Sequence, residues 1–141
     1  EFGELFRTER MFWVGIDDTV VNLDEPLPLA CGPQSCCWRA AALEALNRQG
    51  IDYRVAYTSS NATAITSAVL SGLAIGLLPE SALHADMKIL GEPEGLPRLA
   101  DAQIAVLRSS QAYGGIYDAL ASHILASMGN LHADELLQAA E

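Results

Sequence analysis

The hydrophobic pattern of the chain is that of short strands alternating with amphipathic helices. Runs rich in β-forming residues predict strands at residues 11–16, 27–30, 53–57 and 73–78. Between these runs, apolar side chains recur at helical spacing in residues 36–47 and 62–72. Because consecutive parallel strands need a crossover connection, this order predicts a three-layer α/β sandwich with a mostly parallel sheet.

The second half of the chain has a weaker pattern. It predicts a helical turn at residues 80–84 and strands at residues 87–90 and 101–107. A last helix carries the apolar stripe Ile116, Leu120 and Ile124 and is expected to end at Gly129. Residues 4–10 are largely polar, and no element is predicted for them.

Hydroxyl and amide side chains gather at the carboxyl end of the third predicted strand, in Thr58, Ser59, Ser60 and Asn61. Capping of the next helix explains part of this cluster, and Gly72 is placed to end that helix. Ligands in open α/β sheets bind at the carboxyl ends of strands, so we expect all four side chains to contact a ligand. The helix start, with unpaired N–H groups and a positive dipole end, favours an anion.

A second loop, at residues 31–35, is expected at the same edge of the sheet. Gly32 and Pro33 mark it as a turn between a strand and a helix. Ser35 is expected to cap that helix, and Ser35 and Cys36 are expected to bind the ligand beside the hydroxyl cluster. Arg39 pairs with the ligand or belongs to a solvated face. The alternative is that these polar residues serve only as caps and turns.

Composition narrows the function classes. The chain has 141 residues, half of them hydrophobic, which suits one domain with a real core. Its formal net charge of −10 argues against direct binding of nucleic acid, which needs a basic face. No apolar run approaches the roughly 20 residues of a membrane span, and the first residues are not signal-like. We therefore expect a cytoplasmic protein without membrane contact.

The cysteines and motifs indicate no catalytic or metal chemistry. Cys31, Cys36 and Cys37 are odd in number and lack the spacing of a disulfide framework or zinc site, which favours reduced thiols. A redox or nucleophilic role for Cys36, at a predicted helix start, is the alternative. The sequence contains no nucleophile elbow, Walker loop or dinucleotide fingerprint. We therefore expect no enzyme, no cofactor and no metal.

Several motifs together resemble a known family. They are the segment 27–30, the Gly32-Pro33 turn, Cys36-x-Trp38-Arg39, Ser59-x-Asn61, and Ala68-Val69-x-x-Gly72-Leu73-x-Ile75-Gly76-x-Leu78-Pro79. This combination is similar to the second lobe of LysR-type transcriptional regulators, over roughly residues 10–125. The last run is the specific part of the resemblance.

The resemblance implies a type 2 periplasmic-binding-protein-like fold, in which two α/β lobes face each other across an effector cleft. It implies that residues 17–101, approximately, form a complete second lobe within an effector-binding domain that includes residues 1–141. The remainder, including residues 11–16 and the helix from Ile116, would contribute to the first lobe. The apolar faces of these two elements are expected to be exposed and to drive association.

The implied function is an effector-sensing regulatory domain that binds a small, anionic molecule in the cleft between the lobes. Regulators of this family bind DNA through an N-terminal domain that this sequence does not contain, and they assemble as homo-dimers or tetramers. The alternative is a solute-binding protein or a small enzyme on the same lobe architecture.

Overall fold

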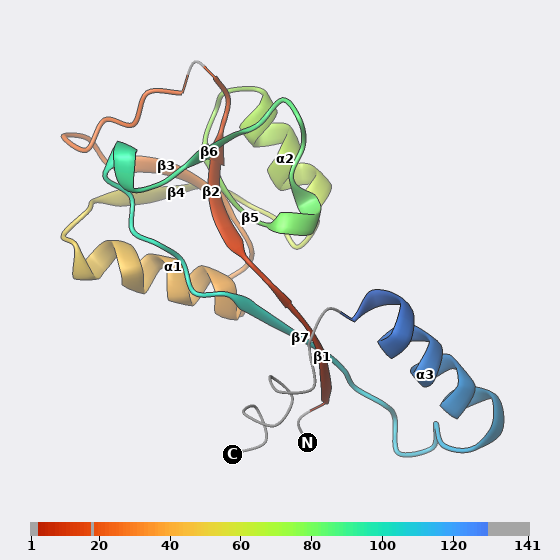
Figure 1. Ribbon diagram of the computed structural model, residues 1–141. Coiled ribbons are helices and arrows are strands. Elements are labelled where there is room, and N and C mark those ends of the chain that lie inside the picture. Colours follow the sequence, from red (N-terminus) through yellow and green to blue (C-terminus); the bar gives the residue numbers. More distant parts are fainter. Residues whose placement is uncertain (1–2, 18, 130–141) are drawn as a thin grey trace. The chain divides into compact units, whose positions relative to one another are not determined.

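The computed structural model describes residues 3–17 and 19–129, which form two compact units (Figure 1). The larger unit is Arg10–Asp101. The smaller unit combines the N-terminal residues through Glu9 with the residues from Ala102 onward.

A five-stranded sheet forms the centre of the larger unit, in the spatial order β4-β3-β5-β2-β6 (Figure 1). Its strands are β2 (Met11–Gly15), β3 (Leu27–Cys31), β4 (Tyr53–Thr58), β5 (Ile75–Pro79) and β6 (Lys88–Leu90). β3 is parallel to both β4 and β5, whereas β2 is antiparallel to both β5 and β6. The sheet is therefore mixed rather than mostly parallel.

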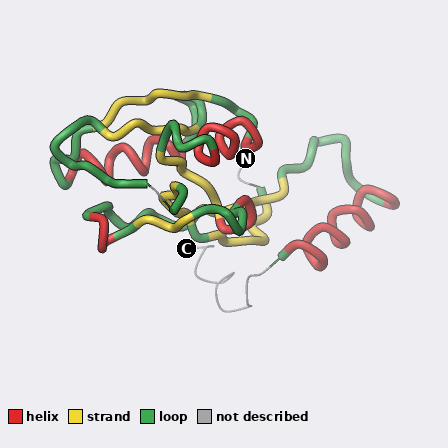
Figure 2. The backbone as a smooth tube through the Cα atoms, turned by 90° about the horizontal axis from the view of Figure 1, so that it is seen from above, coloured by secondary structure: helices red, strands yellow, loops and turns green. Residues whose placement is uncertain are grey.

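β2 accounts for this difference. We expected the strand at residues 11–16 to lie in the other lobe with an exposed apolar face, but it pairs inside this sheet, and Met11, Trp13 and Val14 are buried. The connection from β2 to β3 contains no helix or strand among its described residues (Figure 2). Because no helical crossover joins the two strands, β2 is free to run antiparallel to its neighbours.

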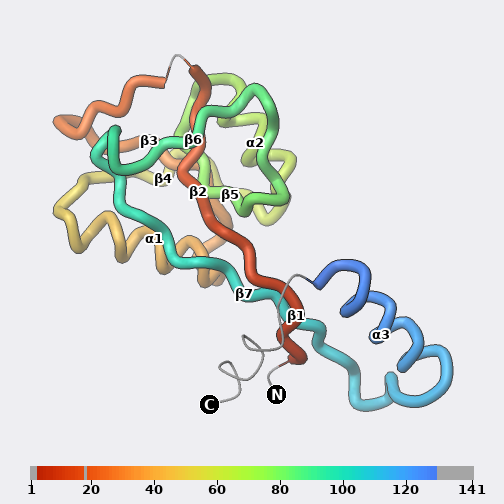
Figure 3. The backbone as a smooth tube through the Cα atoms, viewed as in Figure 1, coloured from red at the N-terminus to blue at the C-terminus, as the bar shows by residue number. Residues whose placement is uncertain are grey.

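Two helices complete three layers around the sheet. α1 (Cys37–Arg48) connects β3 to β4, and α2 (Ala62–Leu70) connects β4 to β5 (Figure 3). β4 and β5 lie on opposite sides of β3, so right-handed crossovers place the two helices on opposite faces. The core between the sheet and α2 consists of Val14, Ala30, Ile65, Ala68, Val69, Ala74 and Leu78.

The two helix starts differ. α2 begins after Asn61, as predicted, and Gly72 has the left-handed φ of +69° expected beyond its end. α1 begins one residue later than predicted, and its cap is Cys36, which makes no side-chain capping bond. The N–H of Cys36 donates to the Pro33 carbonyl at 2.9 Å, which closes a turn that includes Ser35. The prediction that Ser35 caps this helix is therefore wrong.

Close packing of α2 on the sheet depends on Gly76 in β5. A Cβ atom at this position would lie 2.5 Å from Cγ2 of Val69 and 3.0 Å from Cγ2 of Val14. Both valines are fully buried at 0% exposure, so neither side chain has room to withdraw. The absence of a side chain at residue 76 thus sets the distance between helix and sheet.

The last part of the larger unit contains two short 3-10 turns and is joined to β2 by a buried hydrogen bond. The 3-10 turns η1 (Glu80–Ala82) and η2 (Glu92–Glu94) flank β6. The indole Nε1–H of Trp13 donates to the Pro97 carbonyl at 2.9 Å, and Trp13 is only 3% exposed. This bond joins the segment after η2 to β2.

The smaller unit contains a two-stranded antiparallel sheet of β1 (Glu4–Glu9) and β7 (Ala102–Val106), followed by α3 (Gly115–Met128). The pattern did not predict β1, because its buried residues include the charged Glu9, which pairs with Arg7 at 2.6 Å. In α3 the apolar face is exposed as predicted, with Ile116 at 79% and Leu120 at 56%.

Candidate functional site

The carboxyl ends of β3 and β4 bring two polar loops together. Cys31 is opposite Thr58 in the register of these strands, and the N–H of Ser59 donates to the Cys31 carbonyl at 3.2 Å. The loops at residues 31–35 and 58–61 therefore share one edge of the sheet, as the sequence predicted. β5 is parallel to β3, and it ends at the same edge with Pro79.

A pocket of about 220 Å³ lies at this edge, and we call it the Ser60 pocket. Its walls come from the loop after β3, the first turn of α1, the start of α2 and the end of β5. It is lined by Gly32, Pro33, Cys36, Trp38, Ser59, Ser60, Ala62, Ile65, Leu77, Leu78 and Pro79. Of the six predicted ligand-binding residues, Cys36, Ser59 and Ser60 are in this lining, whereas Ser35, Thr58 and Asn61 are not.

Two of the polar side chains stabilise the start of α2. Oδ1 of Asn61 accepts a hydrogen bond from the N–H of Thr63 at 2.8 Å. Oγ of Ser59 accepts one from the N–H of Asn61 at 3.0 Å. These are the local roles expected of a helix cap, so they explain Asn61 and much of Ser59 without a ligand.

Ser60 is different, because neither its hydroxyl nor its N–H has a hydrogen-bond partner among the described residues. The N–H of Ala62, also in the pocket lining, has none there either. The N–H of Ala64 donates to the Asn61 carbonyl at 3.1 Å, so the helix start presents fewer unpaired N–H groups than the sequence suggested. The remaining donors can bind a small oxygen-bearing group.

Arg39 supports the wall of the pocket. Its Nη1 donates to the Gly32 carbonyl at 3.0 Å, which ties the loop after β3 to α1. Burial raises the pKa of the Cys31 thiol, and the positive charge of Arg39 offsets this only partly. Cys31 therefore remains a protonated thiol in the sheet, and Arg39 has a structural partner in the protein itself.

Residues 3–115 match the family model described as LysR substrate binding domain. This chain belongs to that family. A curated relative, the HTH-type transcriptional regulator DgdR of Burkholderia cepacia, is 32% identical over 123 residues. The match covers 87% of this chain and 42% of DgdR. The chain therefore spans less than half the length of that relative.

Solved structures confirm the predicted fold class. The regulatory domain of HypT from Salmonella typhimurium superposes with a TM-score of 0.66 at 18% identity, covering 89% of this chain and 66% of that one. The effector binding domain of QuiR, solved in complex with shikimate, has a TM-score of 0.63 at 14% identity, covering 91% and 65%. These likenesses show that the LysR substrate binding domain has the regulatory-domain fold.

Sequence reasoning missed the apolar part of the site in this LysR substrate binding domain. Trp38, Ile65 and Leu77 line the Ser60 pocket, and none of them was among the predicted ligand-binding residues. The available signal was the end of the apolar run at Pro79, since all parallel strands of one sheet end at the same edge.

Metal sites and membrane-spanning helices were also considered for the described ranges, residues 3–17 and 19–129. No group of three or more His, Cys, Asp or Glu side chains there is arranged to hold a metal ion. No helix in those ranges is long and apolar enough to cross a membrane.

Proposed function

We propose that this LysR substrate binding domain senses a small effector on behalf of a DNA-binding transcriptional regulator. In this proposal the Ser60 pocket holds the effector, which is a small carboxylate with an apolar body. The main observation in support of this proposal is that the pocket has two parts. One end has unpaired hydrogen-bond donors, at Ser60 and Ala62, and the rest of the lining is apolar.

The polar end suits a carboxylate. Hydrogen bonds that involve a charged group contribute about 1.5–3 kcal/mol each, and the Ser60 hydroxyl and two N–H groups are available as donors. The positive end of the α2 dipole adds to the attraction for a negative charge. Because these donors are neutral, they orient the anion without burying an opposite charge that would itself need solvation.

The apolar remainder suits a hydrocarbon body. Trp38, Ile65 and Leu77 offer carbon surface on more than one side of the pocket. Each CH₂ group removed from water contributes about 0.8 kcal/mol, so an apolar carboxylate gains more here than acetate does. The effector binding domain of QuiR, solved in complex with shikimate, supports the carboxylate group of the proposed effector.

We further propose the role of each part of the chain. The unit Arg10–Asp101 serves as the second lobe, extended at its start from residue 17 to include β2, and β1, β7 and α3 contribute to the first lobe. By analogy with DgdR, DNA binding belongs to a helix-turn-helix segment outside this sequence. The regulator would work in the cytoplasm, where its DNA lies, as a homo-dimer or tetramer.

Thermal unfolding of the 141-residue chain with added small molecules tests this proposal. A ligand that binds only the folded state raises the unfolding temperature. Benzoate should raise it more than acetate, which lacks the apolar body, and more than benzyl alcohol, which lacks the charge.

The matched variants are Ser60→Ala, in the pocket, and Ser71→Ala, at the far end of α2. The benzoate effect should be reduced in Ser60→Ala and retained in Ser71→Ala. Equal responses in the two variants, or no response of the parent chain to benzoate, would refute the assignment of the effector to this pocket.

A further inference from the structure

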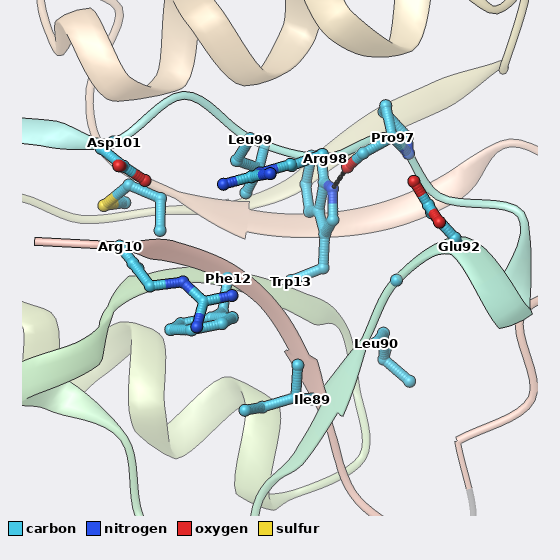
Figure 4. A pocket seen from close by; sticks show the side chains of 12 residues that line it. Arg10, Phe12, Trp13, Ile89, Leu90, Glu92, Pro97, Arg98, Leu99 and Asp101 are labelled. Atoms are coloured by element: carbon cyan, nitrogen blue, oxygen red, sulfur yellow. Dashed lines mark hydrogen bonds between the residues drawn. The ribbon is translucent and has the colours of Figure 1, made fainter.

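The larger unit has a second cavity, of about 340 Å³, that shares no lining residue with the Ser60 pocket (Figure 4). It lies against the start of β2, the end of β6 and the segment that follows η2. We call it the Arg10–Arg98 pocket after the two guanidinium groups that line it. Its volume is within the range of small-molecule sites in proteins.

Neither guanidinium has an ion-pair partner among the described residues. By contrast, Arg7, Lys88 and Arg108 each pair with a carboxylate. The chain carries 18 acidic residues against 8 basic ones, so carboxylates for pairing are abundant. Within the part of the chain that the structure describes, the two arginines at this pocket therefore have no carboxylate in direct contact with them, and their guanidinium donors are available to a ligand.

Aromatic and apolar groups surround the two guanidinium groups. The guanidinium carbon of Arg10 lies 4.9 Å from the centre of the Phe12 ring, which is a cation–π contact within the pocket lining. In Figure 4 the Arg98 side chain extends across the middle of the same pocket. Ile89, Leu90 and Leu99 contribute hydrocarbon surface to the lining.

Two hydrogen bonds position backbone segments that form walls of this pocket. The bond from the Trp13 indole to the Pro97 carbonyl, at 2.9 Å, positions the segment that carries Arg98. On the other wall, the N–H of Gly91 donates to Oε2 of Glu94 at 2.8 Å. Backbone that is already hydrogen-bonded does not have to be ordered when a ligand binds, which favours affinity.

The two carboxylates in the pocket lining limit the charge that a ligand can carry. Glu92 and Asp101 also line it, toward opposite ends in Figure 4, and neither is within ion-pair distance of Arg10 or Arg98. Because the two carboxylates balance the two cations, a polyanion such as phosphate meets repulsion at both ends. A single carboxylate between the guanidiniums accepts charge-assisted hydrogen bonds, with its body on the apolar wall.

We propose that the Arg10–Arg98 pocket is a second binding site, which takes a small organic monocarboxylate with an apolar body. This site is separate from the Ser60 pocket, so the domain has two carboxylate-binding sites in this proposal.

The two tryptophans of the chain make the two sites separately observable. Trp13 lines the Arg10–Arg98 pocket, and Trp38 lines the Ser60 pocket. In proton–nitrogen correlation spectra of the 141-residue chain, each indole N–H gives its own resonance, which the Trp38→Phe variant assigns. Titration with benzoate should move the Trp13 resonance in a saturable manner, and inorganic phosphate at equal ionic strength should leave it in place.

Arg98→Gln removes one guanidinium from the pocket, and Arg54→Gln is the matched control. Arg54 is an exposed residue of β4 that lines neither pocket. The benzoate dissociation constant reported by Trp13 should rise about tenfold in Arg98→Gln and stay unchanged in Arg54→Gln. An immobile Trp13 resonance, an equal response to phosphate, or equal affinity in the two variants would overturn the proposal. The Trp38 resonance reports the Ser60 pocket in the same spectra, so the failure of one site is distinguishable from failure of the other.

Discussion

At the scale of single residues, neighbouring side chains of the same type have different roles. Ser59 and Ser60 are adjacent serines in the Ser60 pocket, yet only the Ser59 hydroxyl is used by the helix start. The cysteines differ in the same way, since Cys31 is buried, Cys36 is half-buried and Cys37 is exposed.

We predict that iodoacetamide alkylates Cys37 fastest and Cys31 slowest in the folded chain, because burial restricts access to Cys31 and raises the pKa of its thiol. Mass spectrometry of peptides from a time course measures these rates, with urea-unfolded chain as the control in which the rates converge. Alkylation of Cys31 as fast as that of Cys37 in the folded chain would show that this edge of the sheet is open.

At the scale of elements, close approach of α2 to the sheet is a consequence of Gly76. We predict that Gly76→Ala lowers the free energy of unfolding by about 1–3 kcal/mol, because the new Cβ meets buried Val69 and Val14. Gly91→Ala is the matched control, since the nearest atom to a Cβ there is Cδ of Pro93 at 4.0 Å. Urea unfolding of both variants measures the difference, and equal stabilities would contradict the packing described for α2.

The turn η2 gives a prediction about pH at the same scale. Donation from the Gly91 N–H, followed by the nearby Lys88 charge, holds the pKa of Glu94 below its ordinary value. A carboxyl group with a depressed pKa stabilises the fold above its unfolded pKa, and this contribution is lost as pH falls through the folded pKa. We therefore predict that Glu94→Gln makes stability less dependent on pH across the carboxyl range. Urea unfolding at neutral and acidic pH measures this, and an unchanged pH dependence relative to the parent chain is the contrary result.

Elements were predictable from the sequence where local signals and long-range packing agree. Asn61 and Gly72 mark the ends of α2 by short-range chemistry, so both could be predicted from the sequence. The partner of β2 depends on pairing with β5, which lies some sixty residues further along the chain, and no local pattern contains that information. The polar loops of the Ser60 pocket were predicted, whereas its apolar wall from β5 was missed, although the end of the apolar run at Pro79 marks the same edge of the sheet.

At the scale of the whole molecule, the exposed face of α3 is the feature that predicts association. Ile116 is 79% exposed and Leu120 is 56% exposed on one side of this helix. Apolar surface of this kind favours self-association, so we predict a concentration-dependent dimer of the 141-residue chain. Ile116→Lys should shift the equilibrium toward monomer, whereas Ser122→Lys, which adds the same charge away from that side, should not. Light scattering coupled to gel filtration measures the mass, and a monomer at every concentration would exclude a role for α3 in assembly.

The central claim is that the Ser60 pocket binds a carboxylate with an apolar body. The position of the Trp38 indole N–H resonance during a benzoate titration tests it most directly, because Trp38 lines that pocket and Trp13 does not. We predict a saturable movement with benzoate that benzyl alcohol does not reproduce. Its dissociation constant should rise in Ser60→Ala and stay unchanged in Ser71→Ala. A Trp38 resonance that stays fixed at high benzoate concentration, or that moves equally in both serine variants, would contradict the claim.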